Sequence, residues 1–146
     1  MSQGIDLATS LGYLLKEASS ALRVAMEAVL RPLGMTITQY SCLELLAQRP
    51  GLSNSELARG AFVTRQSMNV LLQAMERDGL VTRAAEAPVG KVLPTSLTPR
   101  GRQALDAASA AVRSVESRML SGMTGAEQAA ALVSLRSMIA GLQAEG

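Results

Sequence analysis

The side chains best suited to chemistry form a cluster between positions 64 and 74. Arginine, asparagine and glutamine recur there one, three and four residues apart, a spacing that brings side chains to one face of a helix. In the major groove of DNA, arginine pairs well with guanine, and asparagine and glutamine pair well with adenine. The cluster therefore predicts contact with base edges, and the alternative is a solvated helix face. Its members are Arg65, Gln66, Asn69 and Gln73.

The residue types needed for common enzyme chemistry are scarce. The chain has no histidine, and Cys42 is its only cysteine, so the usual base of a catalytic triad, a paired-thiol metal site and an internal disulfide are all missing. We therefore expect no enzyme activity, no metal and no cofactor. Cys42 lies in an apolar stretch, where a buried and unreactive thiol is the usual outcome, and a redox-reactive thiol is the alternative.

Positive charge is concentrated in the middle of the chain. The sequence of 146 residues has a formal net charge of only +2, but positions 59 to 102 hold seven basic and three acidic residues. Such a stretch favours an anionic partner such as DNA. The sequence has no uncharged apolar run of about 18 residues that could span a bilayer and no basic segment before its first apolar residues. We expect a cytoplasmic protein without membrane contact.

Two helices are predicted at the start of the chain. Apolar residues from Leu7 to Leu30 recur at three- and four-residue intervals and predict one amphipathic helix. The segment 31–34 contains Pro and Gly and should end it. Thr36 and Gln39 have the spacing of a capping pair, which predicts a second helix from Thr36 up to the Pro and Gly near position 50.

Two shorter helices follow, joined by a tight turn. Ser53 and Glu56 have capping-box spacing, which predicts a third helix ending near Gly60. Thr64 should cap a fourth helix that has apolar residues on one side and ends at 78–79. This pair matches the helix-turn-helix pattern, and the polar cluster lies on its second helix.

The helical period is lost after residue 79. Alternation at Leu80–Thr82 and again at Val92–Ser96 predicts two short strands around a loop at 86–90. We interpret this segment as a β-wing. Pro94 lies inside the second predicted strand, which restricts that strand to a sheet edge.

Two further helices complete the chain. Thr98 and Pro99 are a cap and a first helical residue, and an apolar stripe continues from them to about Ser121. Thr124 and Glu127 have capping-box spacing and predict a terminal helix.

These elements predict a mainly α (α+β) chain, a winged helix-turn-helix with N- and C-terminal dimerisation helices. We expect one domain over 1–146, with a DNA-binding module at 36–98 and dimerisation helices at 5–33 and 99–143. The apolar stripes of the outer helices exceed what one small winged module can cover, which predicts a homodimer. The alternative is that these helices pack only on their own module.

Four short motifs occur in order along the chain. They are 33–40 (LGMTITQY), 55–58 (SELA), Gly79-Leu80-Val81 before the wing, and Leu97-Thr98 with Gly101 after it. Their order and spacing resemble the MarR family of winged helix-turn-helix transcription regulators, over roughly residues 5 to 142.

The resemblance implies a triangular dimer whose terminal helices interlock and whose recognition helices enter successive major grooves of a pseudo-palindromic double-stranded operator. It also implies repression, with release by a small aromatic or lipophilic effector or by oxidation. Tyr13 and Tyr40 are candidates for an effector cavity, and packing with a bonded hydroxyl is the alternative. The expected DNA contacts are Ser53, Asn54, Ser55, Thr64, Arg65, Gln66, Ser67, Asn69, Gln73, Arg83 and Lys91.

The wing departs from the family pattern. Wings of this family commonly carry an Asp-x-Arg element whose Arg enters the minor groove, whereas this chain has Val89-Gly90-Lys91 there, preceded by Pro88. Lys91 supplies a charge without the planar fork of arginine. The alternative function is therefore a winged-helix module for protein interaction or dimerisation, with weakened or lost DNA binding.

Overall fold

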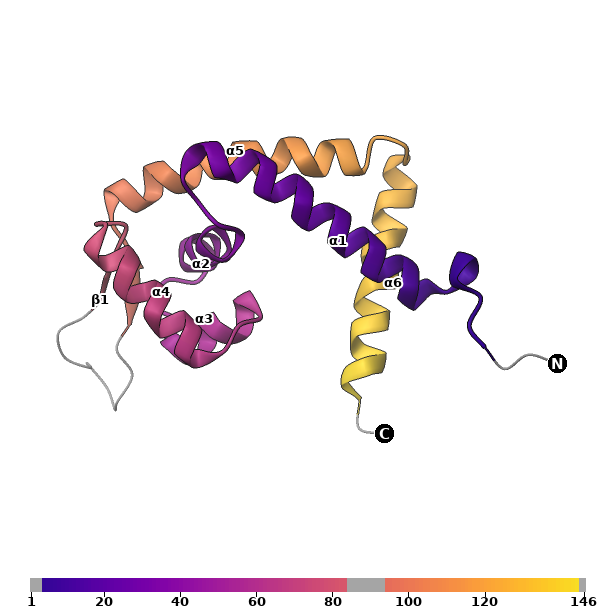
Figure 1. The fold of residues 1–146 in the computed structure, drawn as a ribbon, viewed down its shortest axis with the longest axis horizontal. Coiled ribbons are helices and arrows are strands. Elements are labelled where there is room, and N and C mark those ends of the chain that lie inside the picture. The colour runs from indigo at the N-terminus through magenta and orange to yellow at the C-terminus, as the bar shows by residue number, and fades with distance from the viewer. Residues whose placement is uncertain (1–3, 84–93, 145–146) are drawn as a thin grey trace.

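Helices make up most of the chain, and a small antiparallel sheet lies between the fourth and fifth α-helices (Figure 1). The structure is a computed structural model that describes residues 4–83 and 94–144. It confirms the mainly helical winged helix-turn-helix predicted from the sequence. Its elements are the 3₁₀ turn η1 (Leu7–Thr9), α1 (Leu11–Leu30), the 3₁₀ turn η2 (Arg31–Leu33), α2 (Ile37–Gln48), α3 (Asn54–Ala61), α4 (Arg65–Arg77), β1 (Val81–Arg83), β2 (Thr95–Leu97), α5 (Pro99–Met119) and α6 (Gly125–Gln143).

After the first helix, the predicted helix starts are confirmed by side-chain caps. In α2, the Gln39 backbone N–H donates to Thr36 Oγ1 at 3.1 Å, and the Thr36 N–H donates to Gln39 Oε1 at 2.9 Å. The same reciprocal pairs open α3 and α6. Each pair satisfies backbone donors that have no partner inside the helix, which fixes where the helix begins.

The single first helix predicted from Leu7 is wrong. Asp6 Oδ1 accepts from the Ala8 N–H at 3.1 Å and opens the short 3₁₀ turn η1 instead. Ser10 then accepts from the Tyr13 N–H at 3.1 Å and caps a separate helix, α1. Short polar side chains can bond to nearby backbone N–H groups and so begin a new element. The two caps at Asp6 and Ser10 therefore divide the segment whose apolar spacing predicted one continuous helix.

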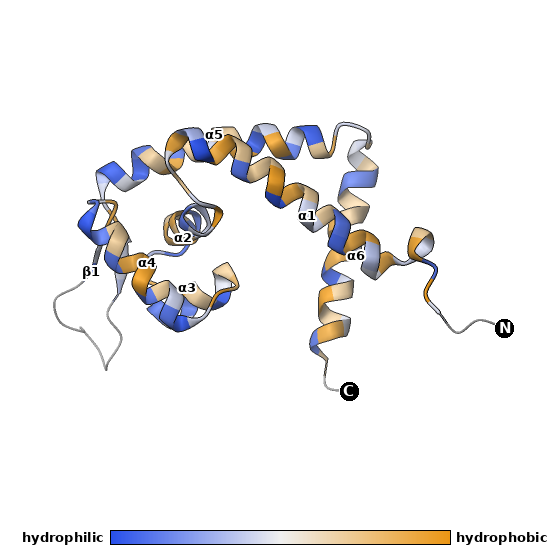
Figure 2. Cartoon of the chain, viewed as in Figure 1, coloured by the Kyte–Doolittle hydropathy of each residue, from blue (hydrophilic) through white to orange (hydrophobic). Residues whose placement is uncertain are grey.

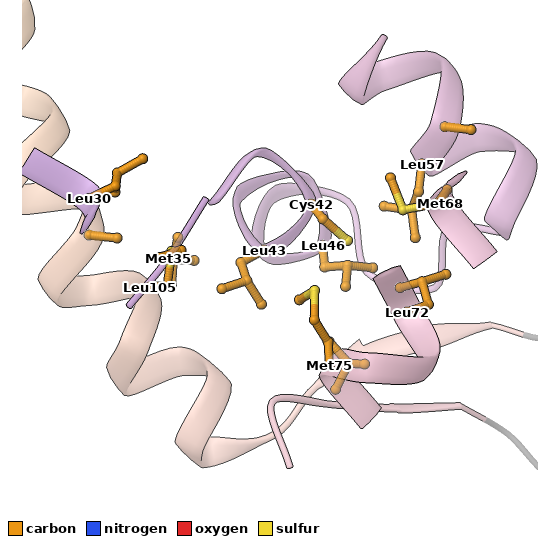
Figure 3. Packing of buried hydrophobic residues seen from close by; sticks show 13 residues of the cluster. Leu30, Met35, Cys42, Leu43, Leu46, Leu57, Met68, Leu72, Met75 and Leu105 are labelled. Carbon is orange, nitrogen blue, oxygen red and sulfur yellow. The ribbon is translucent and has the colours of Figure 1, made fainter. Parts of the chain in front are cut away.

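The buried core lies where α2, α3 and α4 meet the end of α1 and the first half of α5 (Figure 3). Burial of one such Leu or Met side chain contributes about 1.5–3 kcal/mol to folding. This core holds one face of α4 against the rest of the module and leaves the opposite face free. Its leucine and methionine side chains are Leu30, Met35, Leu43, Leu46, Leu57, Met68, Leu72, Met75 and Leu105.

The two strands at the base of the wing differ in position from those that the sequence predicted. β1 pairs antiparallel with β2, with Val81 opposite Leu97 and Arg83 opposite Thr95. The first strand is displaced by one residue from its predicted place. Pro94 lies before β2 rather than inside the second strand, because proline has no N–H to donate to a sheet. The expected loop at 86–90 falls outside the described residues.

A compact set of contacts locks the wing base to the start of α5. The Thr98 hydroxyl donates to the carbonyl oxygen of Gly79, and its oxygen accepts from the Gly101 N–H at 3.0 Å. Gly79 has φ +79°, which suits glycine at the end of α4. A Cβ on Gly101 would overlap the Leu80 carbonyl oxygen, so glycine permits this approach. The motif around 79–81 and 97–101 therefore has a structural role.

The outer helices expose much apolar surface. α6 leads away from the far end of α5, apart from α2, α3 and α4, and apolar residues recur along it (Figure 2). None of its residues is buried, and Val133 and Leu142 are 67% and 85% exposed. Leu7 and Leu11 near the N-terminus are likewise exposed. No helix among the described residues is long and apolar enough to cross a membrane.

Candidate nucleic-acid interface

The turn between α3 and α4 sets the position of the second helix. Phe62 has φ +61°, a left-handed conformation that is uncommon for a residue other than glycine. The following Val63 N–H donates to the Ala58 carbonyl at 3.0 Å. Thr64 then caps α4 by accepting from the Ser67 N–H at 3.0 Å. These bonds fix the direction in which α4 leaves the turn.

The polar residues predicted to read bases lie on the side of α4 that faces away from the core. Met68, Leu72 and Met75 are fully buried on the other side. Arginine, glutamine and asparagine can contact base edges without disturbing the core, because none of them supports it. Of the predicted residues in α4, Arg65, Gln66, Ser67 and Gln73 are exposed and Asn69 is half-buried.

The first turn of α3 is less accessible. Ser53, Asn54 and Ser55 are all half-buried. Ser53 Oγ accepts from the Glu56 N–H at 3.2 Å, so it already serves as the cap. Asn54 Oδ1 is buried without a hydrogen-bond partner among the described residues. In α4, the Thr64 hydroxyl donates to Ser67 Oγ at 3.0 Å, so this predicted contact is also engaged within the chain.

The two predicted wing contacts differ in what the structure shows. Arg83 Nη2 lies 3.4 Å from Glu76 Oε1, with 21% of the arginine side chain and 43% of the glutamate side chain exposed. A single partly exposed ion pair of this kind contributes little to stability. Lys91 lies outside the described residues.

Sequence reasoning missed two exposed side chains of the helix-turn-helix. Val70, on α4, is 61% exposed, and Phe62, in the turn, is 94% exposed. Helical spacing from Gln66 places Val70 on the polar face, but an apolar residue type usually indicates a buried position. The left-handed backbone that turns the Phe62 side chain outward has no signature in a single sequence.

The two tyrosines proposed for an effector cavity do not come together. Tyr40 Oη donates to Glu44 Oε2 at 2.7 Å, and burial, followed by this hydrogen bond, raises the pKa of Tyr40 to about 12. Tyr13 lines a groove along α1 that reaches Arg118 on α5. Tyr40 therefore packs with a bonded hydroxyl, which was the alternative expected for it.

A larger groove lies between the second half of α1 and the start of α2. Its volume is about 880 Å³, and Met26, Met35 and Phe62 contribute apolar surface to its lining. Arg23 and Arg31 add positive charge, so the groove combines apolar surface with cations.

Cys42 is fully buried in the core. Burial raises the pKa of its thiol to about 12. A protonated, inaccessible thiol is a poor nucleophile, because the thiolate is the reactive species.

Comparison with known proteins decides the family. The sequence profile of the MarR family matches residues 33–91. The HTH-type transcriptional repressor Rv2887 of Mycobacterium tuberculosis is 45% identical over 118 residues, which cover 81% of this chain and 85% of the relative. The chain belongs to the MarR family. The order of motifs that resembled this family is therefore confirmed.

Solved structures agree with this assignment. A MarR-family regulator from Silicibacter pomeroyi superposes with a TM-score of 0.84 at 26% identity, covering 97% of this chain and 95% of the other. Rv2887 in complex with DNA gives 0.70 at 38% identity, covering 93% and 99%. Rv2887 in complex with salicylic acid gives 0.73 at 42% identity, covering 89% and 96%.

Proposed function

We propose that the chain is a homodimeric transcription repressor whose two α4 helices enter major grooves of double-stranded DNA. The observation that carries this proposal is the free polar face of α4, opposite the buried Met68, Leu72 and Met75. Rv2887, a repressor of the same family, has been solved with DNA, and this relationship supports the same role here. The regulator would act in the cytoplasm and would have no catalytic function.

The proposed DNA contacts fall into two groups with different chemistry. Arg65, Gln66, Asn69 and Gln73 would read base edges. Phosphate contacts would come from Ser53, Asn54 and Ser55 at the start of α3, from Thr64 and Ser67, and from the wing residues Arg83 and Lys91.

The outer helices would form the dimer. The core packs the module at 36–98 against the end of α1 and the first half of α5. The remaining parts of the helices within 5–33 and 99–143 expose apolar side chains that a monomer leaves in water. A second copy can cover the exposed leucines of α6 and of the N-terminal region in one two-fold interface. The dimer in turn would hold two α4 helices at a fixed separation.

Fluorescence anisotropy with genomic DNA fragments tests the proposal. A repressor should bind certain fragments selectively, and binding should weaken steeply as salt rises, because neutralised phosphates release counterions. Replacement of Arg113, an exposed residue of α5 outside the module, serves as a charge-matched control for variants of α4. A folded dimer with no selective binding would instead support a protein-interaction module.

A small aromatic acid is the proposed effector class. The groove beside α1 offers apolar walls together with Arg23 and Arg31, and Rv2887 has been solved with salicylic acid. With salicylic acid as the probe, Arg23→Gln should weaken binding by about tenfold, the loss expected for one charge-assisted hydrogen bond. Arg118→Gln, in the groove that contains Tyr13, should have no effect. The reverse result would place the acid in that second groove.

A further inference from the structure

An aliphatic side chain lies in the middle of the polar face of α4. Val70 is 61% exposed and does not belong to the hydrophobic core or to the residues packed against it. It follows Gln66 by four residues and precedes Gln73 by three, so the three side chains are neighbours on the helix surface. Both glutamines are exposed.

Neither folding nor the proposed dimer explains a valine at this position. Valine is a weaker helix former than alanine or glutamine, because branching at Cβ restricts its side chain in a helix. In Figure 1, α6 lies apart from α4, so Val70 is not part of the exposed apolar surface of α6. The Val70 side chain is therefore placed to contact another molecule that binds to α4.

The composition around Val70 matches one kind of base pair. In the major groove, an A·T pair presents the N6 and N7 atoms of adenine, which suit a glutamine amide, and the C5 methyl group of thymine, which suits an apolar side chain. A G·C pair has no methyl group there. Glutamine, valine and glutamine side by side thus complement A·T pairs, and none of the three carries a charge.

We propose that Val70 contacts a thymine methyl group and is a specificity-determining residue of the DNA site. This inference rests on the proposed function, because it requires α4 to enter the major groove. It adds that each half-site contains a thymine recognised through its methyl group.

Replacing thymine by deoxyuridine isolates this contact. Deoxyuridine removes only the methyl group and keeps base pairing and hydrogen-bonding atoms. Duplexes selected from a random pool by the full chain would provide the binding site, and each thymine would then be replaced in turn. One position in each half-site should lose about fourfold in affinity, the value of one buried methyl group, and replacement in both half-sites should cost about fifteenfold.

Variants of Val70 assign the effect to this side chain. Val70→Ala should bind the thymine and deoxyuridine duplexes equally at that position, whereas Val70→Ile should still distinguish them. Gln73→Ala is the matched control, because it should lower affinity and keep the sensitivity to deoxyuridine. Both positions are exposed, so thermal melting should show folded protein for all three variants.

The outcomes separate this inference from the proposed function. Selective binding that no deoxyuridine replacement changes would overturn the role of Val70, and the proposed repressor function would still stand. Sensitivity that persists in Val70→Ala would assign the methyl group to another residue and would also overturn the inference. A protein with no selective DNA binding would overturn both.

Discussion

Cys42 and Glu44, two residues apart on α2, show how position decides the chemistry of a side chain. The Cys42 thiol points into the core, where burial raises its pKa to about 12. Burial alone would also raise the pKa of Glu44, but hydrogen bonds from Tyr40, Gln48 and Ser109 together lower it below its usual value. The thiol therefore stays protonated and the carboxylate stays charged near neutral pH.

The thiol environment predicts that peroxide does not regulate the protein. DNA binding of the parent should be unchanged after mild peroxide treatment, because no accessible thiolate is available to react. Cys42→Ser should be equally insensitive. Anisotropy before and after treatment measures this, and release of the parent but not of the variant would show that the buried thiol does react.

Glu44 predicts a pH-dependent contribution to stability. Its carboxylate accepts from Tyr40 at 2.7 Å and from Ser109 at 3.0 Å, and the latter bond joins α2 to α5. Because the folded-state pKa is lowered, the charged group stabilises the fold above its unfolded pKa, and this contribution is lost as pH falls through the folded pKa.

Glu44→Gln should therefore melt at a lower temperature than the parent near pH 7, and the two curves should converge as pH falls below about 4. Glu17→Gln is the control, since Glu17 is an exposed residue of α1 outside the contact between α2 and α5. A difference in melting temperature that stays constant with pH would contradict a role for the charge.

At the scale of elements, the sequence predicted helices well where side chains mark their ends. Thr36, Ser53 and Thr124 each cap the helix expected of them. Prediction failed where several local signals compete, as at η1, and where a short strand carries too little pattern to fix its register. The exposed position of Phe62 depends on the turn backbone and could not be predicted from residue type.

The wing base supplies a stability prediction. Gly101→Ala would place a Cβ against the Leu80 carbonyl, which also accepts from the Thr98 N–H at 3.1 Å. Forcing these groups apart should cost about 1–3 kcal/mol, or several degrees of melting temperature. Gly125→Ala is the control, because no atom lies within 4 Å of its added Cβ. Equal melting temperatures for the two variants would contradict the close approach.

Because α4 is proposed to read bases and the wing to contact phosphates, variants of the two should change DNA binding in different ways. Arg65→Ala or Asn69→Ala should cost about 1–3 kcal/mol of specific binding and relax sequence preference, because each removes bonds to one base. Lys91→Ala should weaken binding to all sequences alike and reduce the salt slope by about one unit. Affinities for specific and random duplexes at several salt concentrations measure both, and unchanged specificity in both α4 variants would exclude this helix from the groove.

At the scale of the whole molecule, the sequence predicts that a dimer forms but does not predict how its two copies fit together. The apolar stripes of the outer helices indicated that another protein surface must bury them. In a single chain, the structure shows many of these apolar residues exposed. The geometry of a dimer depends on how two surfaces fit, which periodicity does not encode. Specificity for DNA then depends on the separation of two α4 helices, which neither helix determines alone.

The spacing of half-sites therefore tests the central claim most directly. A dimer with one α4 in each of two successive major grooves should bind half-sites about one helical turn apart, near 10 base pairs between centres. Inserting five base pairs moves one half-site to the opposite face of the duplex, and affinity should fall to that of random DNA. Inserting five base pairs without any loss of affinity would contradict the account, because the two helices would then not read the DNA together.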